Sequence, residues 1–291
     1  MNIQKSYKVE PQKGCLYLVG TPIGNLQDMT YRAIQILSEV DLIAAEDTRQ
    51  TIKLLNHFQI QKKLYSYHEH NKESSGAELL QLLEKGRNIA LVSDAGMPAI
   101  SDPGYELVRS SVERGIPVIP IPGANAALTG LIASGLPTQR FVFLGFLSKE
   151  KKVLSQQLEQ IKSYQETLII YEAPHRIEKT LKMILEGLGD RNLVLIRELT
   201  KKHEEFIRGT VFEVMQYVEE HPPKGELTLI IQGSSGKEIE RETNQWWQSL
   251  SILEHVEHYI KQDKQPKEAI KLTAKDRNLN KREVYQQYHK L

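Results

Sequence analysis

The chain has 291 residues, of which 40% are apolar and 26% are charged, and its formal net charge is +1. This length excludes a single small core and indicates a globular protein of two domains with an appendage. The balanced charge excludes attraction of nucleic acid by a global positive field, so any basic binding surface must be local. The single cysteine, Cys15, excludes an internal disulfide framework and fits a reducing cytoplasm.

No membrane association is expected. The first fourteen residues carry no apolar core of the kind a signal peptide needs. Residues 116–139 are uncharged, but they contain four prolines and three glycines, and a lipid-exposed helix cannot lose that many backbone hydrogen bonds. This segment is therefore predicted to be a buried strand, a turn and a core helix in a cytoplasmic protein.

Strands and helices are expected to alternate in the first half of the chain. Apolar residues recur at helical spacing in three segments, 30–40, 76–86 and 104–115, and glycine closes the last two. Apolar runs of strand length stand at 16–20, 42–46, 88–93, 117–121 and 141–145. Strand, helix and strand at this rhythm predict an α/β fold with parallel strand pairs.

A second α/β unit with a more meandering order is expected after Gly145. Its predicted elements are a polar helix within 147–164, strands at 167–172, 192–198, 204–210 and 226–233, and helices at 176–189 and 211–220. The boundary is placed near Gly135–Phe146. The expected domains are therefore an N-terminal α/β domain, 15–138, and a second α/β domain, 139–233.

The remainder of the chain reads as a linker and a small all-helical domain. Residues 234–245 are polar without an apolar face, which is typical of a linker, and 246–291 are helical in pattern. Pro266 is expected to start one helix, and Asn280, with Glu283 three residues on, to cap a second. The side chains predicted to face inward are Val284, Tyr285 and Tyr288, against Ile252, Leu253 and Val256. Two short helices across a tight turn resemble a helix-turn-helix.

Charge is concentrated in this tail. Residues 264–291 hold eight basic and three acidic side chains, a net charge of +5, whereas the whole chain carries +1. We expect the module to hold RNA without taking part in the chemistry. A helical bundle that merely docks on the body is the alternative.

Small and turn-forming residues follow the predicted strands, in loops 21–25, 46–49, 93–104, 122–127 and 172–176. Ligands of open α/β sheets bind where such loops meet, at the carboxyl ends of the strands. The first four loops contain no lysine or arginine except Arg49, and no phosphate-binding glycine motif follows a strand, so a cationic or neutral ligand is favoured. The loop aspartates that could form an oxygen cage for a metal are Asp28, Asp47, Asp94 and Asp102. Aspartate more often caps turns and helices, so no metal is predicted.

Residues 16–49 resemble the opening of the tetrapyrrole methylase superfamily. Gly20, Pro22 and Gly24 stand in its turn, Met29, Thr30 and Ala33 in its helix, and Pro122, Gly123 and Ala126 in its Pro-Gly-x-x-Ala loop. The superfamily's Gly-Gly-Asp-Pro loop is replaced by SDAGMPAISDPG, which argues against a porphyrin-like substrate. Together VGTPIGN, AAEDTR, SYHEHN, SDAGMPAISDPG, PGANA and YEAPHR resemble the ribosomal RNA small-subunit methyltransferase I family over residues 15–233.

This resemblance implies two tetrapyrrole-methylase domains with S-adenosylmethionine in the cleft between them. It also implies 2'-O-methylation of a cytidine ribose in the decoding region of 16S ribosomal RNA, a homodimer, and the assembled small subunit as substrate. A sulfonium is positive and prefers carbonyl oxygens and carboxylates to lysines. Carried over by position, the cofactor-binding residues are Pro22, Asp94, Ala95, Gly96, Ile100, Ser101, Asn125, Ala126, Ala127, Tyr171, Ala173, Glu226 and Thr228.

A base that removes the hydroxyl proton during attack would help this reaction. Candidates are Glu46, Asp47, His68 and His70, with Glu69, His175 and Glu204 behind them, and the sequence does not single one out. The residues expected to contact substrate RNA are Arg32, Arg49, His68, His70, Arg176, Lys201 and Lys202. The apolar strands of the second domain are expected to supply the dimer interface. Two alternatives remain: a small-molecule methylase of tetrapyrrole type, and a non-enzymatic RNA-binding protein.

Overall fold

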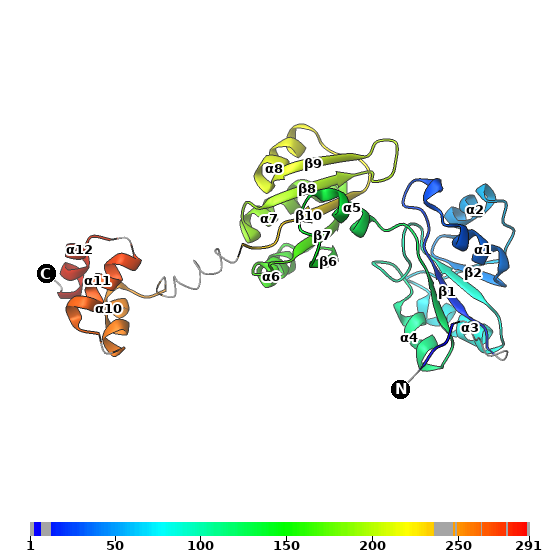
Figure 1. Ribbon diagram of the computed structural model, residues 1–291, viewed down its shortest axis with the longest axis horizontal. Coiled ribbons are helices and arrows are strands. Elements are labelled where there is room, and N and C mark those ends of the chain that lie inside the picture. The colour runs from blue at the N-terminus through cyan, green and yellow to red at the C-terminus, as the bar shows by residue number, and fades with distance from the viewer. Residues whose placement is uncertain are drawn as a thin grey trace. The chain divides into compact units, whose positions relative to one another are not determined.

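The computed structural model describes residues 3–6, 13–235, 247, 249–262, 264–277 and 279–289. Its internal contacts divide the chain into two units, a body (residues 1–233) and a C-terminal unit (residues 234–291) (Figure 1). Most of the predicted linker, 236–245, lies outside the described residues. No helix within the described part of the chain is long and apolar enough to cross a membrane.

The first sheet of the body is wholly parallel, with strand order β3-β2-β4-β1-β5. Its strands are β1 Leu16–Val19, β2 Leu42–Ala45, β3 Leu64–Ser66, β4 Ile89–Val92 and β5 Val118–Ile121. Its helices are η1 Leu26–Asp28, α1 Tyr31–Glu39, α2 Thr48–His57, α3 Lys72–Glu84 and α4 Tyr105–Glu113. Because helices cover both faces, every residue of β2 and β4 is buried, as expected for parallel strands at the centre of a sheet.

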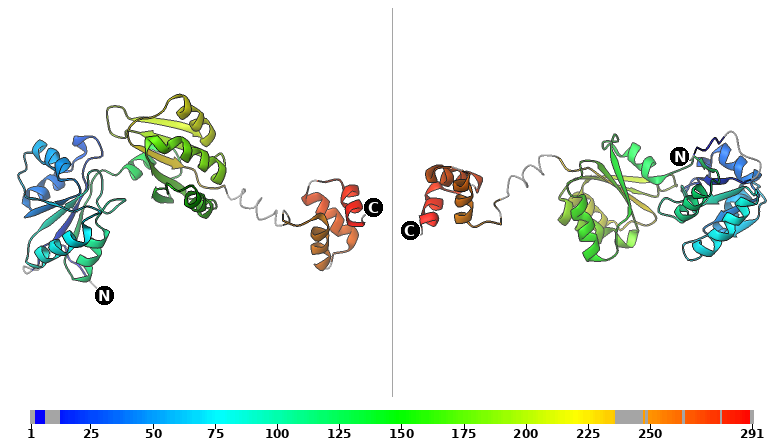
Figure 2. Two further views of the ribbon diagram at one scale, coloured as in Figure 1. Left: turned by 180° about the vertical axis from the view of Figure 1, so that it is seen from behind. Right: turned by 90° about the horizontal axis from the view of Figure 1, so that it is seen from below.

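Each face of the first sheet has its own core. Ala33 and Leu37 of α1 and Leu55 of α2 pack on one face, while Leu83 of α3 and Leu107 of α4 pack on the other (Figures 1 and 2). No element is predicted from the sequence at α2 or β3. Helix α2 is largely polar and buries only Thr51 and Leu55, and β3 has three residues at the edge of the sheet, none of them fully buried.

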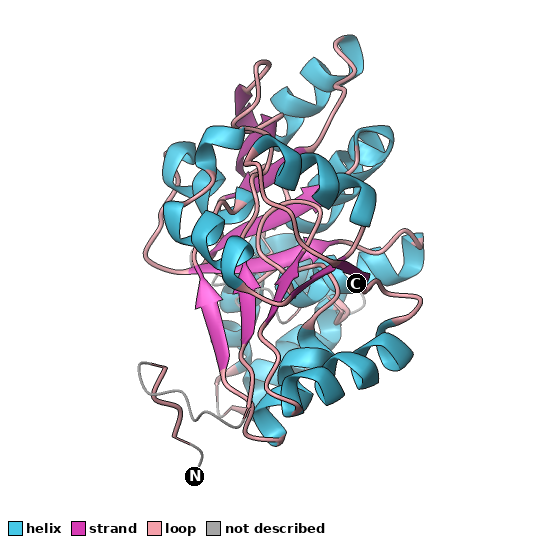
Figure 3. Ribbon diagram, turned by 90° about the vertical axis from the view of Figure 1, so that its right-hand side faces the viewer, coloured by secondary structure: helices cyan, strands magenta, loops and turns pink. Residues whose placement is uncertain are grey.

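The second sheet is mixed, with strand order β6-β7-β10-β8-β9, and its strands are labelled in Figure 1. Figure 3 shows the strands in magenta and the helices in cyan. The strands of the second sheet are β6 Phe141–Phe146, β7 Thr167–Glu172, β8 Asn192–Arg197, β9 Glu205–Thr210 and β10 Leu227–Ile231. Strands β6 and β7 are parallel and the other pairs antiparallel. Four helical segments follow in the chain order: α6 Lys151–Ile161, η2 Pro174–Arg176, α7 Ile177–Leu188 and α8 Val211–Glu220. The α-helices α6, α7 and α8 cover one face of the sheet through a shared apolar cluster.

Helix α5, Ala126–Ser134, covers the opposite face of the second sheet, although it directly follows β5 of the first. Its packing is close, because a Cβ added at Gly130 would lie 2.7 Å from Ile196 Cδ1. The Arg208 guanidinium also donates to Ala133 O (2.7 Å) and Ser134 O (3.3 Å) at the end of the helix. By packing, α5 belongs with the second sheet, whereas sequence order grouped it with the first. The sheet thus has helices on both faces, and the expectation that its strands supply a dimer interface stays a prediction.

In the described residues of the C-terminal unit, three helices pack around one core. These helices are α10 Ile252–Lys261, α11 Pro266–Asp276 and α12 Lys281–His289. They bury Val256, Ala269, Ile270, Ala274 and Val284 together. The two helix-covered sheets of the body and the helices of the C-terminal unit confirm the predicted fold class.

The predicted starts of the two last helices are confirmed. Pro266 lies in the first turn of α11, and the Asn280 side chain accepts the Arg282 N–H (3.0 Å) at the start of α12. Tyr285 was predicted to face inward but is 45% exposed, because residues 284 and 288 take the inner face of α12 and residue 285 lies about 100° around the helix.

Candidate active site

The loops at the carboxyl ends of β1, β4 and β5 are locked together by backbone contacts. Thr21 and Gly96 exchange both backbone hydrogen bonds, at 2.9 and 3.1 Å. Gly20 and Gly123 touch so closely that a Cβ added to Gly123 would lie 2.7 Å from Gly20 Cα. The three loops therefore form one rigid wall of small residues.

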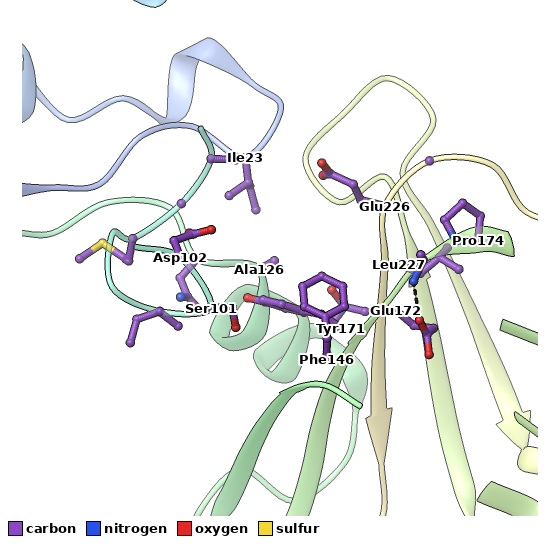
Figure 4. A pocket seen from close by; sticks show the side chains of 18 residues that line it. Ile23, Ser101, Asp102, Ala126, Phe146, Tyr171, Glu172, Pro174, Glu226 and Leu227 are labelled. Carbon is purple, nitrogen blue, oxygen red and sulfur yellow. Dashed lines mark hydrogen bonds between the residues drawn. The ribbon is translucent and has the colours of Figure 1, made fainter. Parts of the chain in front are cut away.

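A cavity of about 330 Å³ lies between this wall and the ends of β7 and β10, in the size range of small-ligand sites (Figure 4). Ten of the thirteen predicted cofactor residues line it, namely Ala95, Gly96, Ile100, Ser101, Asn125, Ala126, Tyr171, Ala173, Glu226 and Thr228. The lining residues that sequence reasoning missed are Ile23, Met97, Asp102, Phe146, Glu172, Pro174, Gly225 and Leu227. Of these, Asp102 belongs to the acidic loop SDAGMPAISDPG, which also supplies Ala95, Gly96, Ile100 and Ser101.

The other three predicted cofactor residues lie outside the cavity lining. Pro22 and Asp94 line a second cavity of about 230 Å³ beside α2. The Asp94 carboxylate accepts the backbone N–H of Asp47 (3.0 Å), which joins the end of β4 to the end of β2. Ala127 donates its N–H to the Tyr171 hydroxyl (3.1 Å), so it orients a lining side chain from behind.

The loop from Gly96 to Gly104 is strained. Its backbone φ is +67° at Ala99 and +61° at Ser101, a region that costs non-glycine residues about 1–3 kcal/mol each. Gly96 has φ +79°, so the substitution Gly96→Val would disturb the backbone itself as well as fill ligand space. Held in this conformation, the loop places Ile100, Ser101 and Asp102 against the cavity.

The cavity is acidic. Among the described residues that line it are three carboxylates and no lysine, arginine or histidine. Glu172 is satisfied internally, because it accepts from the Thr180 hydroxyl (2.6 Å) and the Ala173 N–H (2.8 Å) and pairs with Arg176 (3.3 Å). Burial, with a further contribution from Glu46, raises the pKa of Asp102 to about 7. A cationic ligand would relieve this cost, whereas an anionic one would add to it.

Asp47 and Glu46 differ sharply as candidate bases. Arg49 donates to both oxygens of Asp47 (2.7 and 3.0 Å) and lowers the pKa of that carboxyl to about 2, which leaves a weak base. Burial raises the pKa of Glu46, and the nearby Asp94 carboxylate raises it further. Glu46 also interacts electrostatically with His68 and with Asp102. Of the two carboxylates, Glu46 is therefore the stronger base, and its charge acts on Asp102, which lines the cavity.

The two candidate histidines lie close together, with ring centroids 5.9 Å apart. His70 is exposed, whereas Nδ1 of His68 is buried without a hydrogen-bond partner. Neither ring lines the cavity. Within the described residues, no group of three or more His, Cys, Asp or Glu side chains is arranged to hold a metal ion.

Two predicted RNA contacts are engaged inside the protein. Arg176 donates to Leu147 O (2.9 Å) and Ser148 O (3.2 Å) besides pairing with Glu172, and its side chain is 14% exposed. Lys201 Nζ binds Glu198 (2.8 Å) and Glu226 (3.1 Å). Its stem covers Gly24, where an added Cβ would lie 2.3 Å from Lys201 Cγ. Lys201 thus joins the β8–β9 loop to the loop after β1.

The remaining basic candidates are exposed. Arg32 and Lys202 are exposed, and the side chain of Arg49 is 85% exposed despite its pair with Asp47. These residues and His70 are available to an external ligand.

Comparison with known proteins identifies the family. The model for Tetrapyrrole (Corrin/Porphyrin) Methylases matches residues 15–215. Proteins named ribosomal RNA small subunit methyltransferase I are 58% identical over 289 residues in Halalkalibacterium halodurans, covering 99% of both chains, and 56% identical over 286 residues in Bacillus subtilis, covering 98% of both.

Solved structures share the fold of the body at low sequence identity. Diphthine synthase matches with a TM-score of 0.58 and 14% identity, over 78% of this chain and 94% of that one. Uroporphyrin-III C-methyltransferase from Thermus thermophilus, complexed with S-adenosylhomocysteine, matches with a TM-score of 0.52 and 21% identity, over 75% and 97% of the two chains. The fold, the matched family model and the full-length relatives agree, and the chain belongs to the ribosomal RNA small subunit methyltransferase I family of the tetrapyrrole methylases.

Proposed function

We propose that this protein transfers a methyl group from S-adenosylmethionine to the 2'-hydroxyl of a cytidine ribose in 16S ribosomal RNA, within the small subunit. The observation that carries the proposal is the acidic cavity, in a chain 58% identical to a protein named for methylation of small-subunit ribosomal RNA. Its lining carboxylates suit a sulfonium and an ammonium group. The solved relative that holds S-adenosylhomocysteine has the same fold.

The residues of the cavity fit the cofactor. Among the described residues that line the cavity, Asp102 is the carboxylate available to the positive groups of the cofactor, because Glu172 pairs with Arg176 and Glu226 with Lys201. The wall of small residues exposes backbone N–H and C=O groups, which can hydrogen-bond the edge of an adenine. Apolar side chains, among them Ile23 and Leu227, can cover its faces. When bound, S-adenosylmethionine supplies a methyl group that is already activated for transfer.

The protein's own contribution is then to position the ribose and accept one proton. The bound cofactor would give up its methyl group to the 2'-oxygen and keep the sulfur as the leaving group, and a side chain of this protein would accept the hydroxyl proton. Glu46 is the base we propose, because its raised pKa makes it a better proton acceptor than Asp47. The protein is proposed to act in the cytoplasm as a homodimer.

The proposal is tested with small subunits from cells that lack this gene, incubated with purified protein and S-adenosylmethionine. Nucleoside mass spectrometry is expected to show one new 2'-O-methylcytidine per 16S RNA. Glu46→Gln should lower kcat by about 10²–10⁴-fold, the usual contribution of a general base, with cofactor affinity retained. No new methylcytidine with the wild-type protein would defeat the proposed function. A normal kcat in Glu46→Gln would rule out Glu46 as the base but would leave the proposed function standing.

The same assay separates the alternatives. A tetrapyrrole-type methylase would leave the subunit unmethylated and would modify a porphyrin-like acceptor. A non-enzymatic RNA-binding protein would bind the subunit without consuming S-adenosylmethionine. The SDAGMPAISDPG loop, which replaces the superfamily's Gly-Gly-Asp-Pro loop, favours a different acceptor from the tetrapyrroles.

Two adjacent lysines give a matched test of RNA contact. Lys202 is exposed, whereas Lys201 is held by Glu198 and Glu226. Lys202→Ala is expected to lower the slope of log affinity against log salt for the small subunit by about 0.7–0.9, the effect of one phosphate contact, and Lys201→Ala to leave it unchanged. Filter binding between 50 and 300 mM salt measures both slopes. A reduced slope for Lys201→Ala alone would show that Lys201, and not Lys202, contacts the RNA.

A further inference from the structure

The C-terminal unit has the geometry of a helix-turn-helix. Helix α11 ends at Asp276 and α12 begins at Lys281, so the connection is short, and α10 packs against both helices. In proteins with this arrangement the second helix of the pair contacts the nucleic acid. The corresponding helix here is α12.

One face of α12 carries groups that bind nucleic acids. Arg282, Tyr285, Gln286 and His289 follow one another at spacings of three, one and three residues, which places them on the same side of a helix, and all four are exposed. Val284 and Tyr288 take the opposite side, against the core of the unit. A guanidinium, a phenol ring, an amide and an imidazole can hydrogen-bond or stack with bases and contact phosphates. Tyr285 is 45% accessible, and its ring centroid lies 4.4 Å from that of His289, so the two rings form one exposed aromatic pair.

A row of lysines runs along α11. Lys267, Lys271 and Lys275 stand four residues apart, so they form one ridge, and all three are exposed. The exposed carboxylate of α11, Glu268, pairs with Lys264 instead (3.8 Å). The three lysine side chains of this ridge are therefore available to bind phosphate groups.

Arg277 does not belong to this surface, although it contributes to the positive charge of the tail. Its guanidinium donates to the carbonyl oxygens of Trp247, Leu250 and Ser251 and to Nδ1 of His255. His255 is fully buried, and burial together with Arg277 lowers its pKa, so the ring is neutral at pH 7 and can accept this bond. The outward charge of α11 and α12 thus comes from their lysines and Arg282, on a fold held from inside by Arg277.

We propose that two exposed surfaces of the C-terminal unit bind ribosomal RNA as a second contact outside the cavity: the ridge of Lys267, Lys271 and Lys275 on α11, and the side of α12 that carries Arg282, Tyr285, Gln286 and His289. The inference rests on the proposed function, which supplies ribosomal RNA as the partner. Because the C-terminal unit and the body belong to one chain, each contact raises the effective concentration of the RNA at the other. The body then needs few basic side chains around its acidic cavity.

The test uses the full-length chain with Lys271→Glu, Lys275→Glu and Arg282→Glu combined. The matched control carries Lys179→Glu and Lys182→Glu on α7 and Lys261→Glu on α10, three exposed positions with the same total change of charge. Binding to small subunits and to protein-free 16S RNA is measured across a salt series. S-adenosylmethionine affinity is measured by calorimetry, and KM and kcat for subunit methylation by tritium transfer.

The α11–α12 variant is expected to bind subunits and free 16S RNA at least tenfold more weakly than the control. Its salt slope should fall by about 2–3 relative to the control, as for three lost phosphate contacts, with KM raised and kcat and cofactor affinity unchanged. Equal salt slopes and KM values for the two variants would overturn the inference. Weaker binding to subunits but not to free 16S RNA would overturn it as well and would indicate a ribosomal protein as the partner. If the wild-type protein failed to methylate subunits, the proposed function would fall, while the binding comparison would still decide this inference.

Discussion

Asp102→Asn is expected to abolish measurable binding of S-adenosylmethionine and, at the same time, to stabilise the cofactor-free protein. The carboxyl lines the cavity, and its pKa is raised from 3.8 to about 7, first by burial and then by Glu46. Asparagine keeps the shape of the side chain but removes the charge that would pair with a cationic ligand. A charged group of this kind costs stability until its ligand arrives.

The sign of the pH effect follows from the raised pKa. The folded protein holds a proton on Asp102 that the unfolded chain releases near pH 4, so the free energy of unfolding of the cofactor-free protein falls as pH rises from about 4 to about 7. Asparagine does not titrate, so the Asp102→Asn variant does not lose this stability. At pH 8 its free energy of unfolding should exceed that of the wild type by about 2–4 kcal/mol, given about 1.4 kcal/mol per pKa unit. Urea unfolding at pH 5 and pH 8 measures the difference.

Cofactor affinity should depend on pH in the opposite direction. Below pH 7 a proton must leave Asp102 before a cation can pair with it, so the affinity of the wild-type protein is expected to fall by up to about tenfold for each pH unit below 7. Asp94→Asn is the matched control, because Asp94 lies in the same loop but ties β4 to β2 outside the cavity lining. Calorimetry that showed normal affinity in Asp102→Asn and loss in Asp94→Asn would reverse the two roles.

Gly123→Ala is expected to cost about 2–3 kcal/mol of unfolding free energy and to weaken cofactor binding, as overpacking a tight contact does. The new Cβ would lie 2.7 Å from Gly20 Cα and 2.9 Å from Gly20 C, so backbone would have to yield. The turn after β1 would move, and with it Ile23, which lines the cavity.

Gly76→Ala in α3 is the control for this substitution. Its Cβ would meet Tyr67 Cε2 at 3.7 Å, an ordinary contact, and alanine favours a helix over glycine by about 1 kcal/mol. Urea unfolding should therefore separate the two variants in opposite directions from the wild type. Unchanged stability in Gly123→Ala would show that the two turns can move apart freely.

The fold class could be predicted from the sequence because the strands that carry it are short, fully apolar runs between amphipathic helices. LIAA of β2 and IALV of β4 are buried from end to end, and their identity as strands follows from their short length between helical segments. The sheet on which α5 packs could not be predicted in this way. Its small, apolar residues fit either sheet, and Gly130 against Ile196 decides the choice only in three dimensions.

The loops of the site could be predicted more reliably than the roles of single residues in them. Glycine, alanine and proline after a strand indicate a ligand at the sheet edge, and the wall forms where they stand. Asp102 was weighed only as a metal ligand or cap, because an aspartate before Pro-Gly usually belongs to a turn and its burial is invisible in the sequence. The internal engagement of Arg176 and Lys201 could not be predicted for a related reason. A basic residue shows its charge in the sequence but not the internal carboxylates that already hold it.

The placement of α5 also decides where the polypeptide can be cut into expressible pieces. A fragment beginning at residue 139, the predicted start of the second α/β domain, would lack α5. It would leave Ile169, Ile196 and Ile230 of the second sheet exposed to water. Such a fragment should aggregate. A fragment beginning at Pro122 would retain the helix, and with it a covered sheet and the bond from Ala127 to Tyr171.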